Sequence, residues 1–156
     1  IGTADGIFSP NAPVTKGMFA AILHRAAGAP APGEPSPFDD VAKESWYEVP
    51  IAWAAEQGLV VGVDVGTFAP DMPVTREQMA VMLYRRAKAQ GLNTGARNSL
   101  ALFSDRDAVS PWAREAVQWA VSAGVLAGTD DDCLQPLAGA DRAQTAAMLV
   151  RFEALH

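Results

Sequence analysis

Apolar residues recur at intervals of three and four in two kinds of segment along this chain. The segments 46–58 and 112–124 follow this helical spacing, and each ends on a glycine, which is typical of the position after a helix. A second kind of segment opens at Thr75-Arg76-Glu77-Gln78 and continues with apolar residues three and four positions apart. We call the first kind front helices and the second kind back helices. The pattern is helical rather than alternating, and it predicts an all-α fold.

The same pattern returns along the chain, which indicates internal repeats. An offset of 66 residues aligns Trp46 with Trp112, Gly58 with Gly124, Arg76 with Arg142 and Arg85 with Arg151. An offset of 60 residues aligns Gly2 with Gly62, Phe8 with Phe68, Thr15 with Thr75 and Arg25 with Arg85. Chance does not place so many glycine, tryptophan and arginine matches in one register.

The register divides the chain into about two and a half helix-loop-helix repeats. The first repeat is 1–29 and has only its back half, the second is 37–88, and the third is 102–156. A spacer rich in proline and glycine (30–36) and a polar linker (89–101) separate them. Because one two-helix unit cannot bury its apolar faces alone, we expect the repeats to share one core with pseudo-threefold character. The front half of the first repeat either lies upstream or is replaced by another segment.

Each back helix is preceded by a residue that suits an N-cap. Thr75 with Gln78, and Asp141 with Gln144, have the spacing of a capping box, in which two side chains satisfy otherwise unpaired backbone donors. Thr15 has Met18 at the corresponding position and so lacks the usual Glu or Gln. The sequence predicts complete capping boxes in the second and third repeats only.

Composition excludes several classes of function. The 156 residues carry 12 basic and 18 acidic side chains, a formal net charge of −6, which argues against a nucleic-acid partner. A single cysteine, Cys133, cannot form an internal disulfide or a cysteine-rich metal site. No run of about 20 apolar residues is present, so membrane insertion is not expected. We expect no metal and no cofactor.

The repeat resembles the S-layer homology domain, a module of bacterial surface proteins that usually occurs in threes. The front pattern is carried by Phe38-Asp39-Asp40-Val41 with Trp46, and by Phe103-Ser104-Asp105 with Trp112. The loop pattern is Gly62 followed by Gly66-Thr67-Phe68-Ala69-Pro70, and the Thr-Arg-Ala-Glu signature of the family is approximated by residues 75–78. The resemblance implies a three-lobed helical spindle whose grooves bind a secondary cell-wall polysaccharide, often one carrying pyruvylated sugars. It further implies a non-catalytic, extracellular anchor at the bacterial cell wall or S-layer.

A pyruvylated sugar carries a carboxylate, and the first turns of the back helices offer matching chemistry. Arg76 and Arg142 each lie in such a turn, where free N–H groups and the helix dipole favour an anion. Lys16 occupies the same position in the first repeat, but it lacks a planar fork and so predicts a weaker site. The alternative is that these residues are solvated first-turn cations.

Further candidate ligand contacts have structural alternatives. Thr15, Thr75 and Asp141 are first of all helix caps that can also frame a site, and Glu77 belongs to the signature. Trp46 and Trp112 serve packing or stack on a sugar, and Gly62 and Gly128 serve backbone geometry or close ligand approach. We interpret three other sets as structural. These are the helix-end cations Arg25, Arg85 and Arg151, the core residues Trp53 and Trp119, and the turn or cap residues Asp40 and Asp105.

Two alternatives stay open. A helical repeat of this kind can also serve protein-protein interaction or S-layer assembly, with neighbouring surface-protein subunits as partners. Enzyme chemistry has little support, because Cys133 and the histidines His24 and His156 form no recognisable nucleophile pair. The run Asp130-Asp131-Asp132 fails the EF-hand pattern, since the sixth loop position is Gln135 rather than glycine.

Overall fold

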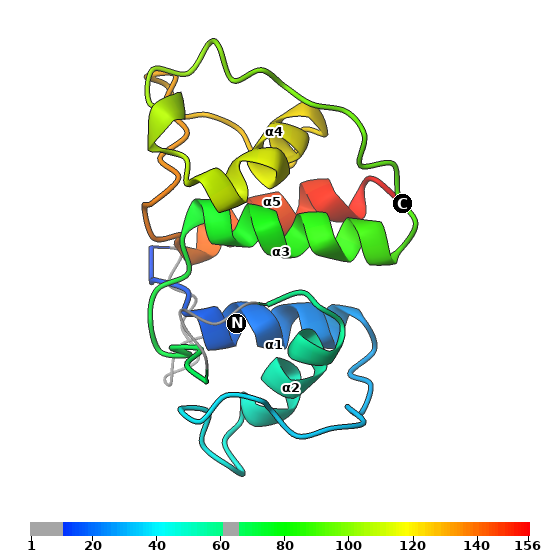
Figure 1. Cartoon of the computed structure of the whole chain (residues 1–156). Coiled ribbons are helices and arrows are strands. Elements are labelled where there is room, and N and C mark those ends of the chain that lie inside the picture. Colours follow the sequence, from blue (N-terminus) through cyan, green and yellow to red (C-terminus); the bar gives the residue numbers. More distant parts are fainter. Residues whose placement is uncertain (1–10, 61–65) are drawn as a thin grey trace.

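The chain folds as a set of short helices joined by long loops (Figure 1), as seen in a computed structural model that describes residues 11–60 and 66–156. Five α-helices and two short 3₁₀-helices are present in these residues, without a β-sheet, so the all-α prediction is confirmed. The elements are α1 (Lys16–Ala26), α2 (Glu48–Glu56), α3 (Arg76–Ala89), η1 (Arg106–Ala108), η2 (Pro111–Ala113), α4 (Arg114–Ser122) and α5 (Arg142–Glu153).

The back helices α1, α3 and α5 begin where the caps were predicted. Thr75 and Asp141 accept the backbone N–H of Gln78 and Gln144, and both glutamines accept the cap N–H in return. The expectation that the first repeat lacks a box is wrong. The Met18 sulfur lies 3.4 Å from the Thr15 nitrogen and takes the place of the glutamine oxygen. A weakly accepting thioether therefore completes the third box.

A ring of backbone hydrogen bonds joins the three segments that lead into the back helices. The N–H of Val14 donates to the Ala140 carbonyl at 3.0 Å, that of Val74 to Val14 at 2.9 Å, and that of Ala140 to Val74 at 2.9 Å. All three side chains are buried. Each residue thus donates to one repeat and accepts from the other, which gives the molecule its pseudo-threefold character.

The shared core is built from residues in equivalent register on the three back helices. Phe19, Met79 and Thr145 occupy one such position, and each is at most 2% exposed. The Thr145 hydroxyl donates to the Asp141 carbonyl at 2.8 Å and lies 3.6 Å from the Met79 sulfur, which places α5 against α3. The third repeat thus contributes a smaller and more polar residue at this level than the other two.

Each front helix packs against the back helix of the preceding repeat. Helix α2 lies on α1 and helix α4 lies on α3, as Figure 1 shows. Trp53 and Trp119 anchor these contacts and are 3% and 1% exposed, which confirms their prediction as packing residues. Their rings face His24 at 5.4 Å and Tyr84 at 5.6 Å between centroids. The repeats therefore interlock rather than forming self-contained helix pairs.

Candidate functional site

The N-termini of α1 and α3 are closed to a ligand by the loop of the following repeat. The N–H groups of Lys16 and Gly17 donate to the carbonyls of Met72 and Pro70, both at 2.9 Å. The corresponding groups of Arg76 and Glu77 donate to Ala138 and Pro136, both at 3.0 Å. The expectation of free first-turn donors is therefore wrong at these two helices, because the next loop and the cap supply acceptors for all three N–H groups. At α5 the N–H of Arg142 likewise donates to the Ala12 carbonyl, at 3.1 Å, and the N–H of Gln144 donates to the cap.

The cations in these two first turns point into the protein. The Arg76 guanidinium donates from Nε to the Leu134 carbonyl at 2.8 Å and from Nη2 to the Ala127 carbonyl at 2.7 Å. Lys16 does the same in the first repeat, donating from Nζ to the Phe68 carbonyl. Both residues are 6% exposed. These contacts give both cations a structural role, and their part in ligand binding stays a prediction.

Burial shifts the titration of both buried cations. It lowers the pKa of Lys16, an effect that the negative charge of Asp40 partly offsets. It also lowers the pKa of Arg76, and the nearby charge of Arg151 acts in the same direction. A guanidinium remains charged despite such a shift, so Arg76 is a permanent cation inside the protein.

The remaining first-turn and loop candidates also make internal contacts. Glu77 is 1% exposed, and its carboxylate accepts the Ser110 N–H at 2.9 Å and the Ser110 hydroxyl at 2.6 Å. A Cβ at Gly128 would lie 2.5 Å from the Phe103 ring, so glycine is required there for packing. Gly62 lies outside the described residues. Glu77 and Gly128 both hold front segments or loops in place.

The two equivalent tryptophans Trp46 and Trp112 lie on the surface. Each is 61% exposed, so the packing alternative that we considered for them is wrong. Helix α2 begins after Trp46, and Trp112 lies in the 3₁₀ turn ahead of α4, so neither indole joins the buried face of its helix. Both remain available as flat surfaces for a sugar ring.

Asp40 and Asp105 hold the loops in place rather than capping the front helices. Asp40 accepts the N–H groups of Phe68 and Ala69 at 2.9 and 2.7 Å. Asp105 accepts those of Leu134 and Gln135, both at 2.8 Å. Burial alone would raise the pKa of Asp40. These two hydrogen bonds, together with one from its own backbone N–H and the positive charge of Lys16, outweigh burial and hold the pKa below its ordinary value. In the second and third repeats, the aspartate of the front pattern thus accepts two hydrogen bonds from the loop of the same repeat.

We expect Asp40→Ala to lower the free energy of unfolding at pH 7 by about 1–2 kcal/mol, because two backbone donors lose a charged acceptor at an exposed site. Since the pKa of Asp40 is depressed in the folded state, its contribution is complete above the unfolded pKa. It is lost as the pH falls through the folded pKa.

Urea unfolding followed from pH 7 to pH 2 checks this prediction. The curves of the parent and the variant should converge in acid, whereas Asp71→Ala, at an exposed aspartate, should change little. Curves that stay equally far apart down to pH 2 would mean that the charge of Asp40 does not stabilise the loop.

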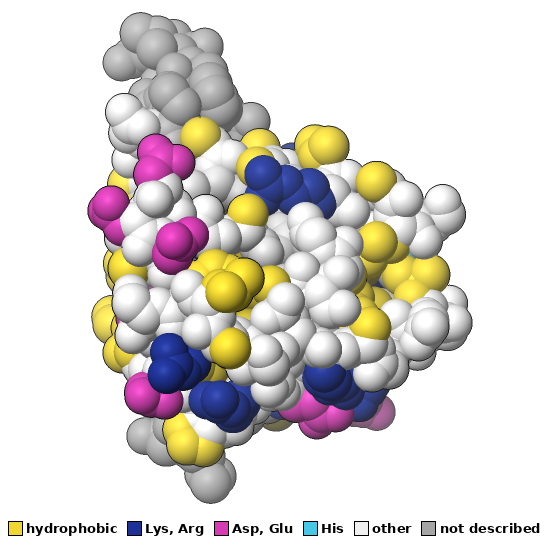
Figure 2. Space-filling model, turned by 90° about the horizontal axis from the view of Figure 1, so that it is seen from above, with side chains coloured by type: hydrophobic (Ala, Val, Ile, Leu, Met, Phe, Trp, Pro, Cys, Tyr) yellow, Lys and Arg dark blue, Asp and Glu magenta, His cyan; other side chains and the backbone are white. Residues whose placement is uncertain are grey.

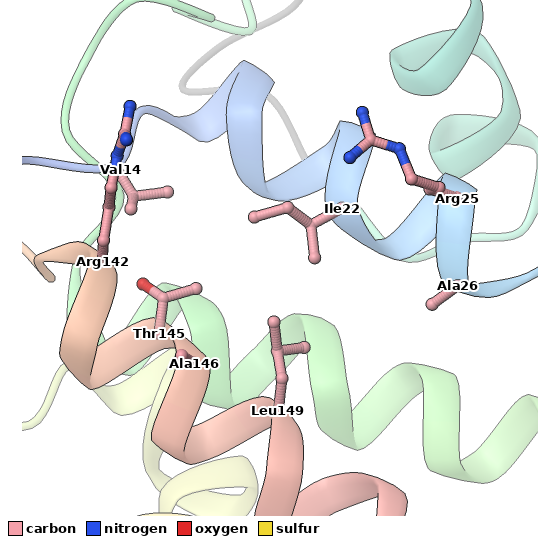
Figure 3. A pocket seen from close by; sticks show the side chains of 8 residues that line it. All are labelled: Val14, Ile22, Arg25, Ala26, Arg142, Thr145, Ala146 and Leu149. Carbon is pink, nitrogen blue, oxygen red and sulfur yellow. The ribbon is translucent and has the colours of Figure 1, made fainter. Parts of the chain in front are cut away.

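An open pocket of about 400 Å³ lies between α1 and α5. Its wall is formed by Val14, Ile22, Arg25, Ala26, Arg142, Thr145, Ala146 and Leu149. Figure 3 shows Ile22 and Leu149 pointing toward the space between the two helices, with Arg142 at the start of α5 and Arg25 near the end of α1. The pocket thus presents an apolar middle with an arginine among the lining residues toward each end.

The three back helices meet in pairs at three interfaces, which we call seams. The residues at the other two seams explain why this pocket, at the seam between α1 and α5, is open. Between α1 and α3 the positions of Thr145 and Ile22 are taken by Phe19 and Met82, which are 0% and 5% exposed. Between α3 and α5 they are taken by Met79 and Met148, which are 0% and 2% exposed. Larger side chains fill those two seams, whereas Thr145 and the branched Ile22 leave space in the third.

Of the residues that line this pocket, the sequence analysis named only Arg142 as a ligand contact. It missed Arg25 because the position near the end of α1 favoured a purely electrostatic role at the helix terminus. The signal that could have found the site is Thr145, which breaks an otherwise large and apolar register. On the face of the molecule in Figure 2, Lys and Arg side chains form separate small groups with apolar side chains between them. The cations visible on this face are therefore dispersed rather than gathered into one broad basic patch.

Comparison with known proteins fits this architecture. The sequence profile of the S-layer homology domain matches residues 37–80 and 102–146, which is more than half of the chain. The chain belongs to the S-layer homology family. The two profile matches cover the two front helices and the starts of α3 and α5.

Relatives of this S-layer homology chain are much longer proteins. It is 32% identical over 148 residues to an endoglucanase of Bacillus sp. (strain KSM-635), covering 95% of the chain and 16% of the endoglucanase. It is 32% identical over 129 residues to the surface-layer 125 kDa protein of Lysinibacillus sphaericus, covering 83% of the chain and 10% of that protein. It is 28% identical over 155 residues to the cellulosome-anchoring protein of Acetivibrio thermocellus, covering 96% of the chain and 34% of that protein. The chain therefore spans about a third or less of each.

The family and these matches agree on a surface role. S-layer homology domains are non-catalytic anchoring modules, and the endoglucanase is matched only over this small share of its length. Together with the surface-layer and anchoring proteins among the relatives, the family indicates an extracellular location at the bacterial cell surface. None of the helices in residues 11–60 and 66–156 is both long and apolar enough to cross a membrane.

Proposed function

We propose that this chain anchors its parent protein by binding an anionic cell-wall polysaccharide non-covalently in the pocket between α1 and α5. The observation that carries the proposal is the pocket itself, which has apolar walls and an arginine toward each end. A sugar with a carboxylate, such as a pyruvate ketal, suits this surface because it combines apolar C–H faces with a planar anion.

In this proposal Arg142 and Arg25, which line opposite ends of the pocket, bind the anionic groups of the polysaccharide. A guanidinium binds a carboxylate through two parallel hydrogen bonds, a contact worth about 1.5–3 kcal/mol. The net charge of −6 opposes an anionic ligand only weakly, because diffuse surface charge is screened over about 8 Å at physiological ionic strength. Ile22 and Leu149 supply contact area for the ring between the two cations.

The exposed indoles extend the proposed surface beyond the pocket. Neither Trp46 nor Trp112 is among the residues that line it, so a sugar stacked on either would belong to another part of the same polymer. Several weak contacts on one chain hold it firmly, because each contact raises the effective concentration for the next. Asp141 contributes indirectly, as the cap that fixes the start of α5 beside Arg142.

Calorimetric titration with defined wall-polymer fragments tests the proposal. We expect fragments with the ketal carboxylate to bind at least about 10-fold more tightly than matched fragments without it, because a guanidinium makes stronger hydrogen bonds to a carboxylate than to the hydroxyl groups of a neutral sugar. Binding should also weaken as salt is raised.

Sedimentation with purified cell walls supplies the control. The chain should pellet with intact walls and stay in solution once the wall polysaccharide has been extracted. Binding that survives extraction unchanged would overturn the proposal and favour a protein partner, such as a neighbouring surface-protein subunit.

A further inference from the structure

Three half-buried side chains close the reciprocal hydrogen bonds of the back-helix caps, and one of them is a methionine. Gln78 and Gln144 accept the N–H of their cap residues with the amide oxygen, at 2.9 and 3.1 Å. Met18 accepts with its sulfur, which lies 3.4 Å from the Thr15 nitrogen. Because a thioether is a weak acceptor, the cap of α1 has the weakest of the three bonds.

Oxidation would turn Met18 into a close structural copy of glutamine. In methionine sulfoxide the sulfur stands where glutamine has its Cδ atom, and the added oxygen corresponds to the amide oxygen. The methyl group corresponds to the amide nitrogen, so the two side chains have equally many heavy atoms. Helices α3 and α5 already hold a side chain of this size at the equivalent position. We therefore expect the cap of α1 to accommodate the added oxygen and to use it as an acceptor.

The other four methionines of the chain differ from Met18 in their access to solvent. Met79, Met82 and Met148 are 0%, 5% and 2% exposed, so an oxidant reaches them only when the fold opens. Met72 is 59% exposed in the loop ahead of α3 and should react fastest. Met18 combines partial access to solvent with a nearby N–H group that a new oxygen can bind.

We propose that Met18 is an oxidation site at which hydrogen peroxide strengthens the cap of α1. A lone pair of the sulfur attacks one peroxide oxygen, an S–O bond forms and the O–O bond breaks. The proton of the transferred oxygen passes to the other oxygen, which leaves as water. The sulfur is oxidised by two electrons and the peroxide is reduced by two. A location at the cell surface supports the proposal, because oxidants outside the cell meet such a protein directly.

The position of Met18 reverses the usual effect of sulfoxide formation. A sulfoxide in an apolar core destabilises the fold, because a polar group is buried without a partner. At the start of α1 the Thr15 N–H is already directed at the sulfur and supplies that partner. Oxidation of Met18 should therefore stabilise the first repeat, while the buried methionines of the shared core stay protected.

Brief peroxide treatment of the Met72→Leu variant tests the proposal, because this variant lacks the most exposed competing sulfur. Peptide mass spectrometry should show Met18 oxidised at least about 10-fold faster than Met79 or Met148. The oxidised chain should have a Tm about 2 °C higher than the untreated chain, because a stronger acceptor now binds the cap N–H. Hydrogen exchange of the Thr15 amide, followed by NMR, should slow at least about 3-fold.

Two further variants in the same Met72→Leu chain isolate the role of Met18. Met18→Gln is the permanent mimic, and it should raise the Tm by about 2 °C without peroxide. Met18→Leu is the matched control, because it keeps an apolar side chain but has no acceptor. Brief peroxide treatment should leave the Tm of both variants unchanged.

Three outcomes would overturn the proposal. The first is a Tm that falls or stays the same when Met18 is oxidised. The second is a Met18→Gln variant whose Tm is no higher than that of its parent, since the cap would then gain nothing from an oxygen acceptor. The third is oxidation of Met18 as slow as that of Met79, which would mean that the fold protects its sulfur like those of the core.

Discussion

Arg76→Ala is expected to lower the free energy of unfolding by about 3 kcal/mol and the Tm by roughly 6–12 °C. The side chain is 6% exposed and donates to the carbonyls of Leu134 and Ala127, so its removal leaves two acceptors unpaired and opens a space beneath the loop of the third repeat. Thermal and urea unfolding monitored by circular dichroism measure the loss.

Arg76→Lys is the matched control, because the first repeat already uses Lys16 to hold the equivalent carbonyl of Phe68. Lysine can replace one of the two hydrogen bonds, so this variant should keep more than half of the lost stability. Should Arg76→Ala leave the Tm unchanged while abolishing wall binding, the guanidinium would be a ligand contact and not a link between repeats.

Arg25→Ala is expected to weaken binding to the carboxylate-bearing wall fragment by about 10-fold, and Arg25→Ala with Arg142→Ala by about 100-fold. Each substitution removes an arginine that lines the pocket between α1 and α5. Arg25 is exposed, so its removal should leave the Tm within about 2 °C of the parent. Titration calorimetry and thermal unfolding of the same samples separate the two effects.

Arg151→Ala is the control for charge, because Arg151 occupies the register of Arg25 on α5 but does not line the pocket. Thr145→Met is the control for shape, since the third repeat would then carry the residue that α3 has at Met79. It should block binding while keeping the fold. Equal losses from Arg25→Ala and Arg151→Ala would show that only the net charge matters.

Local sequence patterns were sufficient to predict the back helices and two of their three capping boxes. Thr75 with Gln78 and Asp141 with Gln144 form the predicted boxes, because a capping box depends on residues only three positions apart. The start of the front helices was harder to predict. Trp46 continues the apolar spacing of α2 but lies before its first turn, so its indole reaches the surface.

The candidate site could be predicted only in part, because the contacts that shape it join residues far apart in the sequence. Arg76 and Arg142 are equivalent in the sequence and both open a back helix. Whether such a cation is held by a carbonyl inside the protein depends on a loop more than 50 residues away, as the contact of Arg76 with Leu134 shows. Thr145 was the available clue, since one small polar residue in an apolar register marks a place where packing differs.

The ring formed by Val14, Val74 and Ala140 has a mechanical consequence for a tether. In a linear array of repeats, force applied to one end can peel off the terminal unit first. Here the first and last repeats are bonded directly to each other, so no unit is terminal in space. Pulling either end repeat away from the other two therefore also breaks hydrogen bonds of this ring.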